Sequence, residues 1–142
     1  MVKDKKTIKV LIICTGNSAR SQMAEGFFKN YKKDWKIFSA GILPKGINHL
    51  AIGVMKEINI DISKQTSNQV NEYLNYDFDY VITVCDNAKE TCPIFPNAKK
   101  IIHWSIEDPA EFEGSKEDRL KVFRKIRDQI KDKIWNFIKV SS

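Results

Sequence analysis

The sequence has few of the residues on which metal centres and disulfide frameworks are built. Its 142 residues include three cysteines and two histidines. An odd number of cysteines argues against a static disulfide framework, and cysteines in a reducing compartment more often have catalytic, redox or metal-binding roles. Zinc is not expected, because Cys85 and Cys92 lack the usual spacing of about two to four residues between zinc ligands. His49 and His103 form no metal motif with them, so we expect no metal site.

Long apolar runs are also missing. No apolar stretch approaches the roughly 20 residues that cross a bilayer. The N-terminal residues 1–6 are basic, but the apolar run that follows them, 8–13, is too short for the core of a signal peptide. We therefore expect a cytoplasmic protein without a membrane partner.

The charge pattern does not favour nucleic acid as a partner. Lysine and arginine exceed aspartate and glutamate by 24 to 18, which gives a net charge of +6. This charge suits an anionic substrate, but the lysines are spread along the chain and form no basic face interleaved with aromatic residues. The length, together with the absence of repeats and linkers, predicts a single domain over 1–142, and no long coiled-coil pattern demands a dimer, so we expect a monomer.

Strand and helix patterns alternate along the chain. Apolar and β-branched runs predict strands over 7–13, 36–40, 80–84 and 100–104. Apolar residues at 3–4 spacing predict helices up to about residue 31, over 48–58 and over 115–138, with a further short helix over 67–74. Such alternation predicts an α/β fold, a single three-layer domain in which helices flank a four-stranded parallel sheet.

The most informative stretch, Cys14 to Ser21, joins the first predicted strand to the first helix. A helix N-terminus offers unpaired N–H groups and a partial positive charge, which bind anions and favour the thiolate form of a nearby cysteine. The Arg20 guanidinium can grip an oxyanion in a bidentate fork, and Ser21 can donate a hydrogen bond to the Cys14 sulfur. The stretch therefore predicts a nucleophile inside an oxyanion cradle formed by Thr15, Gly16, Asn17, Ser18, Ala19, Arg20 and Ser21. The alternative is a buried, inert cysteine with a solvated arginine.

Two further groups follow strand ends and are expected at the same edge of the sheet. Asp108 precedes Pro109, which keeps it out of helical geometry, so its carboxyl group can be held in place as a general acid. An Asp-Pro pair is also common in simple turns. Cys85 and Cys92 would stand about 10.5 Å apart along a straight helix, so a disulfide between them requires the segment to unwind or loop. The alternative is two separate thiols.

The stretch from Cys14 to Ser21 resembles the phosphate-binding loop of the low-molecular-weight protein tyrosine phosphatases. It is more similar to that of the related thioredoxin-coupled arsenate reductases, because Gln22 follows the Arg-Ser pair where the phosphatases usually have proline. The resemblance spans about residues 8 to 137. Further matching stretches are Ser39–Gly41, Met55–Glu57, Ile60–Ser63, Cys85–Pro93, His103–Trp104 and Glu107–Ala110.

The resemblance implies that the chain reduces arsenate to arsenite. It implies attack by Cys14 on arsenic, an oxyanion held by Arg20 and the loop, and protonation of the departing oxygen by Asp108. It also implies a Cys14–Cys85 disulfide and then a Cys85–Cys92 disulfide, which thioredoxin reduces, with no bound cofactor. Two alternatives remain: a phosphatase acting through a Cys14 phosphoenzyme, and an anion- or redox-sensing protein without catalysis.

Two positions depart from the family pattern. Ala19 stands where many relatives have a further cysteine, which is not part of the three-thiol relay. Some relatives also bind potassium through residues that match Asn17, Glu25, Ser39 and an acid after a Thr-Ser pair. Here that acid is replaced by the neutral Asn68, which argues against a potassium site.

Overall fold

The computed structural model of the chain describes residues 7–86 and 98–141. Cys92 lies outside these ranges. The strands are β1 (Lys9–Cys14), β2 (Lys36–Gly41), β3 (Phe78–Cys85) and β4 (Ala98–Ser105). The α-helices are α1 (Arg20–Tyr31), α2 (His49–Lys56) and α3 (Lys116–Ser141), and the 3₁₀ helices are η1 (Val70–Tyr73) and η2 (Pro109–Glu111).

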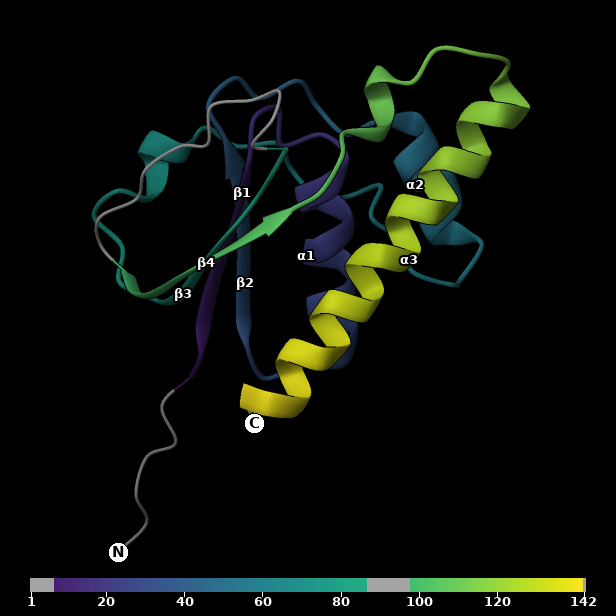
Figure 1. Cartoon of the computed structure of the whole chain (residues 1–142). Coiled ribbons are helices and arrows are strands. Elements are labelled where there is room, and N and C mark those ends of the chain that lie inside the picture. The colour runs from purple at the N-terminus through teal and green to yellow at the C-terminus, as the bar shows by residue number, and fades with distance from the viewer. Residues whose placement is uncertain (1–6, 87–97, 142) are drawn as a thin grey trace, which may run out of the picture.

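The strands form one parallel sheet in the order β2-β1-β3-β4 (Figure 1). In the centre of the sheet, Ile12 of β1 lies opposite Ser39 of β2 and Ile82 of β3. After β1 the chain forms β2 on one side of β1, and it later returns to form β3 on the other side. In open α/β sheets such a switch in winding direction marks the strand whose carboxyl end faces the binding crevice.

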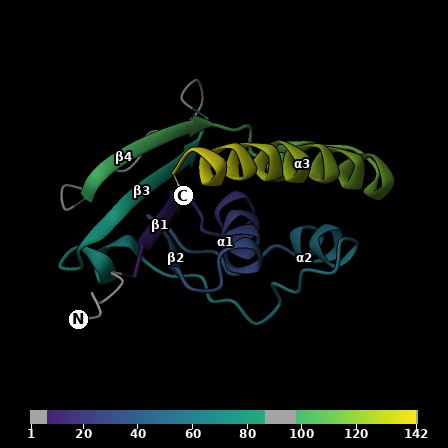
Figure 2. The same cartoon turned by 90° about the horizontal axis from the view of Figure 1, so that it is seen from below.

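The three α-helices cover one face of the sheet (Figure 2). They pack on the alternate β1 residues Val10, Ile12 and Cys14, which all point to this face. Along α3 a buried stripe recurs at helical spacing and faces the core, which confirms the amphipathic helix expected there. Its buried members are Phe123, Ile126, Ile130, Ile134 and Ile138.

The opposite face carries a smaller apolar cluster, in which Leu11, Ile13 and Val81 pack with Val70 of η1. The short helix predicted over 67–74 is present as η1, a 3₁₀ helix of four residues that begins only at Val70. The residues before it run alongside the end of β2, where the Gly41 N–H donates to the Asn68 carbonyl. This pairing holds residues 67–69 in an extended path, so only the last part of the stretch can coil.

The observed sheet confirms the predicted α/β fold with four parallel strands; of the two outer layers expected, the three α-helices form one, and η1 lies on the opposite face. Within the two described ranges, no helix combines the length and the apolar character needed to cross a membrane. Cys14, Cys85 and Ser105 each end a strand, so the segments that follow them emerge at the same edge.

Candidate active site

The loop of residues 15–19 connects the end of β1 to the start of α1. Helix α1 begins at Arg20, and the residue before it, Ala19, makes no side-chain capping bond to the helix N-terminus. Asn17, in the middle of the loop, has a φ of 43°. This left-handed conformation is unusual for a residue with a side chain, and such strain clusters at ligand-binding sites.

Four consecutive carbonyl groups of the loop are tied to neighbouring segments. Those of residues 15, 16 and 18 accept from the backbone N–H groups of Leu43, Lys45 and Asn48, and that of residue 17 accepts from the side chains of Gln22 and Ser67. The C=O and N–H of a trans peptide point in opposite directions. The N–H groups of residues 16–19 are therefore turned toward the inside of the loop, where an oxyanion can accept from them.

The Cys14 thiol is buried, with 2% of the residue exposed, and its Sγ lies 2.9 Å from Ser21 Oγ. Asn17 Nδ2 donates to the same hydroxyl oxygen at 2.7 Å. Because this bond occupies a lone pair of the hydroxyl, the Ser21 proton is available for the sulfur. The arrangement can stabilise a thiolate by a hydrogen bond to the charged form.

Arg20 and Asp108 lie side by side. The guanidinium of Arg20 is buried, donates from Nη1 to the Ile106 carbonyl at 3.0 Å, and has Nη2 at 3.6 Å from Asp108 Oδ2. Asp108 has extended backbone angles before Pro109, as the sequence predicts, and its Oδ1 accepts from the Ala110 N–H at 2.9 Å. The carboxyl group is thus fixed while 26% of it stays exposed.

These groups share one pocket of about 260 Å³. Its lining comes from the loop and from two other segments: Cys14, Thr15, Gly16, Ser18, Ala19, Arg20, Lys45, Asn48, Asp108, Ala110 and Glu111. Lys45 and Asn48 were not singled out from the sequence as site residues. The signal at Asn48 is its position before an apolar helix, whose first N–H groups it caps through Oδ1.

Cys85 ends β3 and is completely buried. Val84, the residue before it, belongs to the same cluster as Cys14, on the helix-covered face of the sheet. Since side chains alternate along a strand, the Cys85 side chain points to the opposite face from that of Cys14. The predicted partner of Cys85 in the second disulfide, Cys92, lies outside the described residues.

Comparison with known protein families identifies the family of this chain. The family described as low molecular weight phosphotyrosine protein phosphatase matches residues 9–140. The chain belongs to this family.

Relatives in this family to which the chain is similar include proteins named arsenate reductases. The arsenate reductase of Halalkalibacterium halodurans is 46% identical over 129 residues, which are 90% of this chain and 93% of that protein. A solved structure described as an arsenate reductase in the phosphate binding state has a TM-score of 0.81 and 34% identity, over 96% of this chain and 100% of the other. The thioredoxin-dependent arsenate reductase of Corynebacterium glutamicum has a TM-score of 0.68 and 26% identity, over 96% of this chain and 64% of the other.

Proposed function

We propose that the chain is an arsenate reductase in which three thiols carry an electron pair from a buried pocket to thioredoxin. The observation that carries the proposal is the Cys14 thiol, hydrogen-bonded to Ser21 and placed at the start of an oxyanion loop that it shares with Arg20. The relatives named above support arsenate as the oxyanion.

The first step forms a bond between sulfur and arsenic. Arsenate sits in the loop, where the inward N–H groups and the Arg20 guanidinium neutralise its charge. The Cys14 thiolate attacks arsenic, and Asp108 protonates the departing oxygen, which leaves as water. The position of Asp108 next to Arg20 at the mouth of the pocket supports this role.

The second step carries out the reduction. The Cys85 thiolate attacks Cys14 Sγ, and the electron pair of the sulfur–arsenic bond stays on arsenic, which leaves as arsenite. A Cys14–Cys85 disulfide remains. Because the two side chains point to opposite faces of the sheet, the end of β3 has to leave its strand conformation for this attack.

The third step moves the oxidised pair to the surface. The Cys92 thiolate attacks Cys85 Sγ, which releases the Cys14 thiolate and leaves a Cys85–Cys92 disulfide. The dithiol of thioredoxin then reduces this disulfide and is itself oxidised. The name of the thioredoxin-dependent relative supports this choice of reductant.

The family match also favours a second function, hydrolysis of phosphate monoesters. Cys14, Arg20 and Asp108 would serve that reaction through a phosphoenzyme on Cys14, with water attacking phosphorus in the second half. Neither Cys85 nor Cys92 has a role in it. These two cysteines therefore discriminate between the proposals.

Arsenate-dependent oxidation of NADPH, coupled through thioredoxin and thioredoxin reductase, tests the relay. We expect many turnovers in the native protein and one equivalent of arsenite per protein in Cys92→Ser, where the oxidised pair cannot reach the surface. Cys14→Ser removes the nucleophile and gives no arsenite. Hydrolysis of an aryl phosphate, measured on the same three proteins, should be unchanged by Cys92→Ser and lost in Cys14→Ser.

Two results would overturn the proposal. The first is full turnover of arsenate in Cys92→Ser, which would remove the third thiol from the relay. The second is an absence of arsenate-dependent oxidation alongside brisk hydrolysis of the aryl phosphate, which would leave a phosphatase.

A further inference from the structure

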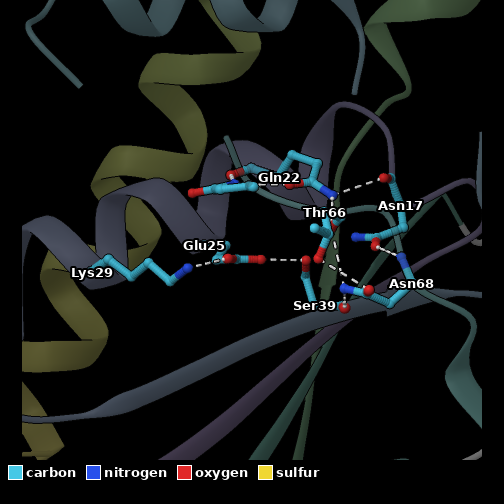
Figure 3. Close-up of polar contacts among 8 residues, drawn as sticks. Asn17, Gln22, Glu25, Lys29, Ser39, Thr66 and Asn68 are labelled. Carbon is cyan, nitrogen blue, oxygen red and sulfur yellow. Dashed lines mark hydrogen bonds and ion pairs between the residues drawn. The ribbon is translucent and has the colours of Figure 1, made fainter. Parts of the chain in front are cut away.

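A partly buried polar network lies behind the oxyanion loop and joins it to α1, β2 and the segment before η1 (Figure 3). Its oxygen-bearing residues match those that hold potassium in some of the relatives that the sequence resembles. The exception is Asn68, which stands where those relatives have an acidic residue. Whether they fit a cation here depends on what their oxygen atoms already contact. Each contact can be followed from Glu25 toward the loop.

The Glu25 carboxylate is buried, with 5% of the residue exposed. Its Oε1 accepts from the Ser39 hydroxyl and its Oε2 accepts from Lys29 Nζ, each at 2.5 Å. Lys29 lies one turn along α1 and half of its side chain is exposed, so its ammonium group stays partly hydrated while it balances the buried charge. The positive charge that a cation would bring to Glu25 is already present.

Asn68 places a donor where a carboxylate would have only acceptors. Its Nδ2 donates to the carbonyl groups of Ser39 at 3.2 Å and Thr66 at 3.1 Å, while its Oδ1 accepts from the Thr66 hydroxyl at 3.1 Å. The side chain of an aspartate at this position has no N–H to donate, so it would leave both carbonyls facing a negative charge. Such a group of oxygens is a ligand set for a cation, and the amide of Asn68 removes it.

The network continues into the reactive part of the loop. The Asn68 backbone N–H donates to Asn17 Oδ1 at 2.7 Å, and Asn17 Nδ2 donates to Ser21 Oγ, the neighbour of the Cys14 sulfur. These two bonds fix both ends of the Asn17 side chain, in a residue whose backbone is left-handed. The position of Asn68 therefore bears on how Ser21 is presented to Cys14.

We propose that this chain replaces a monovalent cation behind the oxyanion loop with donors of its own, the Asn68 amide and the Lys29 ammonium. Both are positioning residues: Asn68 reaches the loop through Asn17, and Lys29 reaches it through Glu25, Ser39 and Asn68. The loop is then held in its binding conformation in any monovalent salt. The inference concerns the structure of the loop, so it holds independently of the reaction that Cys14 performs.

Thermal unfolding in two salts of equal concentration tests this inference. Potassium chloride is compared with N-methyl-D-glucamine chloride, whose cation is too large for a buried site. The variants are Asn68→Asp, which restores the carboxylate, and Asn71→Asp, which makes the same change at an exposed residue of η1. The alkylation rate of Cys14 by iodoacetamide, measured in the same buffers, reports on the loop itself.

For the native protein and Asn71→Asp we expect the same Tm and the same alkylation rate in both salts. Asn68→Asp should have a lower Tm in the organic cation and regain about 3–6 °C in potassium, as expected for an ion present at about ten times its Kd. Its alkylation rate should become potassium-dependent as well. Lys29→Met, which leaves the rest of the network in place, should also acquire a potassium-specific rise in Tm.

The inference is overturned if the native protein shows a potassium-specific rise in Tm as large as that of Asn68→Asp. It is also overturned if neither Asn68→Asp nor Lys29→Met responds to potassium. Should Asn68→Asp fail to fold in either salt, Lys29→Met alone decides, because its change lies at the half-exposed end of the network.

Discussion

The Cys14 sulfur contacts a hydroxyl that is itself held by an amide, and in the proposed mechanism this contact supports the reactivity of Cys14. Asn17 Nδ2 donates to Ser21 Oγ, and Ser21 Oγ lies 2.9 Å from the sulfur. A hydrogen bond to a charged group contributes about 1.5–3 kcal/mol, and Ser21→Ala removes the one between Ser21 and the sulfur. We expect Ser21→Ala to slow alkylation of Cys14 by iodoacetamide about tenfold or more, measured at neutral pH on the peptide that contains Cys14.

Ser67→Ala is the matched control for this measurement. Its hydroxyl also enters the loop, but it donates to the Asn17 carbonyl at 2.9 Å and does not contact the sulfur. Alkylation of Cys14 in this variant should stay within about twofold of the native rate. Equal slowing in both variants would instead trace the effect to general loosening of the loop.

Gly41 packs so closely against the backbone of the loop that a side chain would not fit there. A Cβ built on it would lie 2.7 Å from the Thr15 carbonyl oxygen, 2.8 Å from the Asn17 nitrogen and 2.9 Å from the Cys14 carbonyl oxygen. All three are backbone atoms, so the loop itself has to shift. We expect Gly41→Ala to weaken phosphate binding at least tenfold and to destabilise the fold by about 1–3 kcal/mol, the usual range for overpacking.

Phosphate titration by calorimetry and urea unfolding measure these two effects. Gly53→Ala is the control, because a Cβ there meets no atom within 4 Å. Gly53 lies inside α2, where alanine is the better helix former, so this variant should gain about 0.5–1 kcal/mol and bind phosphate normally. Normal phosphate binding in Gly41→Ala would show that the loop tolerates the displacement.

Single residues also show what the sequence could and could not predict about the site. The proximity of Arg20 to Asp108 was predictable, because both follow strand ends that a parallel sheet brings to one edge. The left-handed backbone of Asn17 was not, since it depends on bonds from Gln22, Ser67 and Asn68, up to 51 residues away. Local sequence patterns do not indicate which residues so far apart in the chain will contact each other.

At the scale of elements, one carboxylate connects α2 to α3. Glu57, which follows α2, accepts from Arg124 Nη2 at 2.8 Å and from Arg127 Nη1 at 2.9 Å. Arg127 Nη1 also donates to the Val54 carbonyl. The hydrogen bond from Arg124 is the main cause that lowers the pKa of Glu57 below its ordinary value of 4.5, with Arg127 adding to it.

The lowered pKa gives this link a definite pH dependence. Since the folded protein favours the charged form, Glu57 stabilises the fold above about pH 4.5, and this contribution is lost as the pH falls through the lower pKa of the folded state. We expect Glu57→Gln to lower the free energy of unfolding at pH 7 by at most about 1 kcal/mol, because the pair is largely exposed. The difference from the native protein should shrink below pH 4.5.

Urea unfolding at pH 7, 5 and 3.5 measures this difference, with Glu113→Gln as the control for losing an exposed carboxylate. A deficit in Glu57→Gln that stays constant down to pH 3.5 would contradict the assignment. It would mean that the glutamate acts through packing or helix capping and not through its charge.

Element boundaries show the same division between local and distant causes. β3 begins at Phe78, two residues before the predicted start. The prediction began too late because the polar Asp79 interrupts the apolar pattern of the strand. In the fold this carboxylate accepts from the Lys9 backbone N–H at 2.9 Å and pairs with Lys99 at 3.3 Å. The buried stripe of α3 can be recognised from the spacing of its own residues, without any distant contact. Its prediction from that spacing is confirmed.

On the scale of the whole molecule, the site depends on segments that only the complete fold brings together. The pocket is lined by residues from the loop after β1, from 45–48 and from 108–111. An oxyanion that binds in this pocket would find these segments together only in the folded state. Its binding free energy therefore adds to the stability of the entire fold.

We expect phosphate, arsenate and sulfate to raise the Tm of the native protein, with chloride at equal ionic strength as the control. At about one hundred times the Kd the stabilisation is about 2.7 kcal/mol, which corresponds to a rise of about 5–10 °C for a chain of this length. Arg20→Lys keeps the charge but loses the planar fork that grips two oxygens, so most of this rise should disappear. Because each protein is compared with itself in chloride, a lower starting Tm in the variant does not affect the result. A full rise in Arg20→Lys would mean that the loop N–H groups bind the anion without the fork, and Arg20 would then act mainly by holding Ile106 and Asp108 in place.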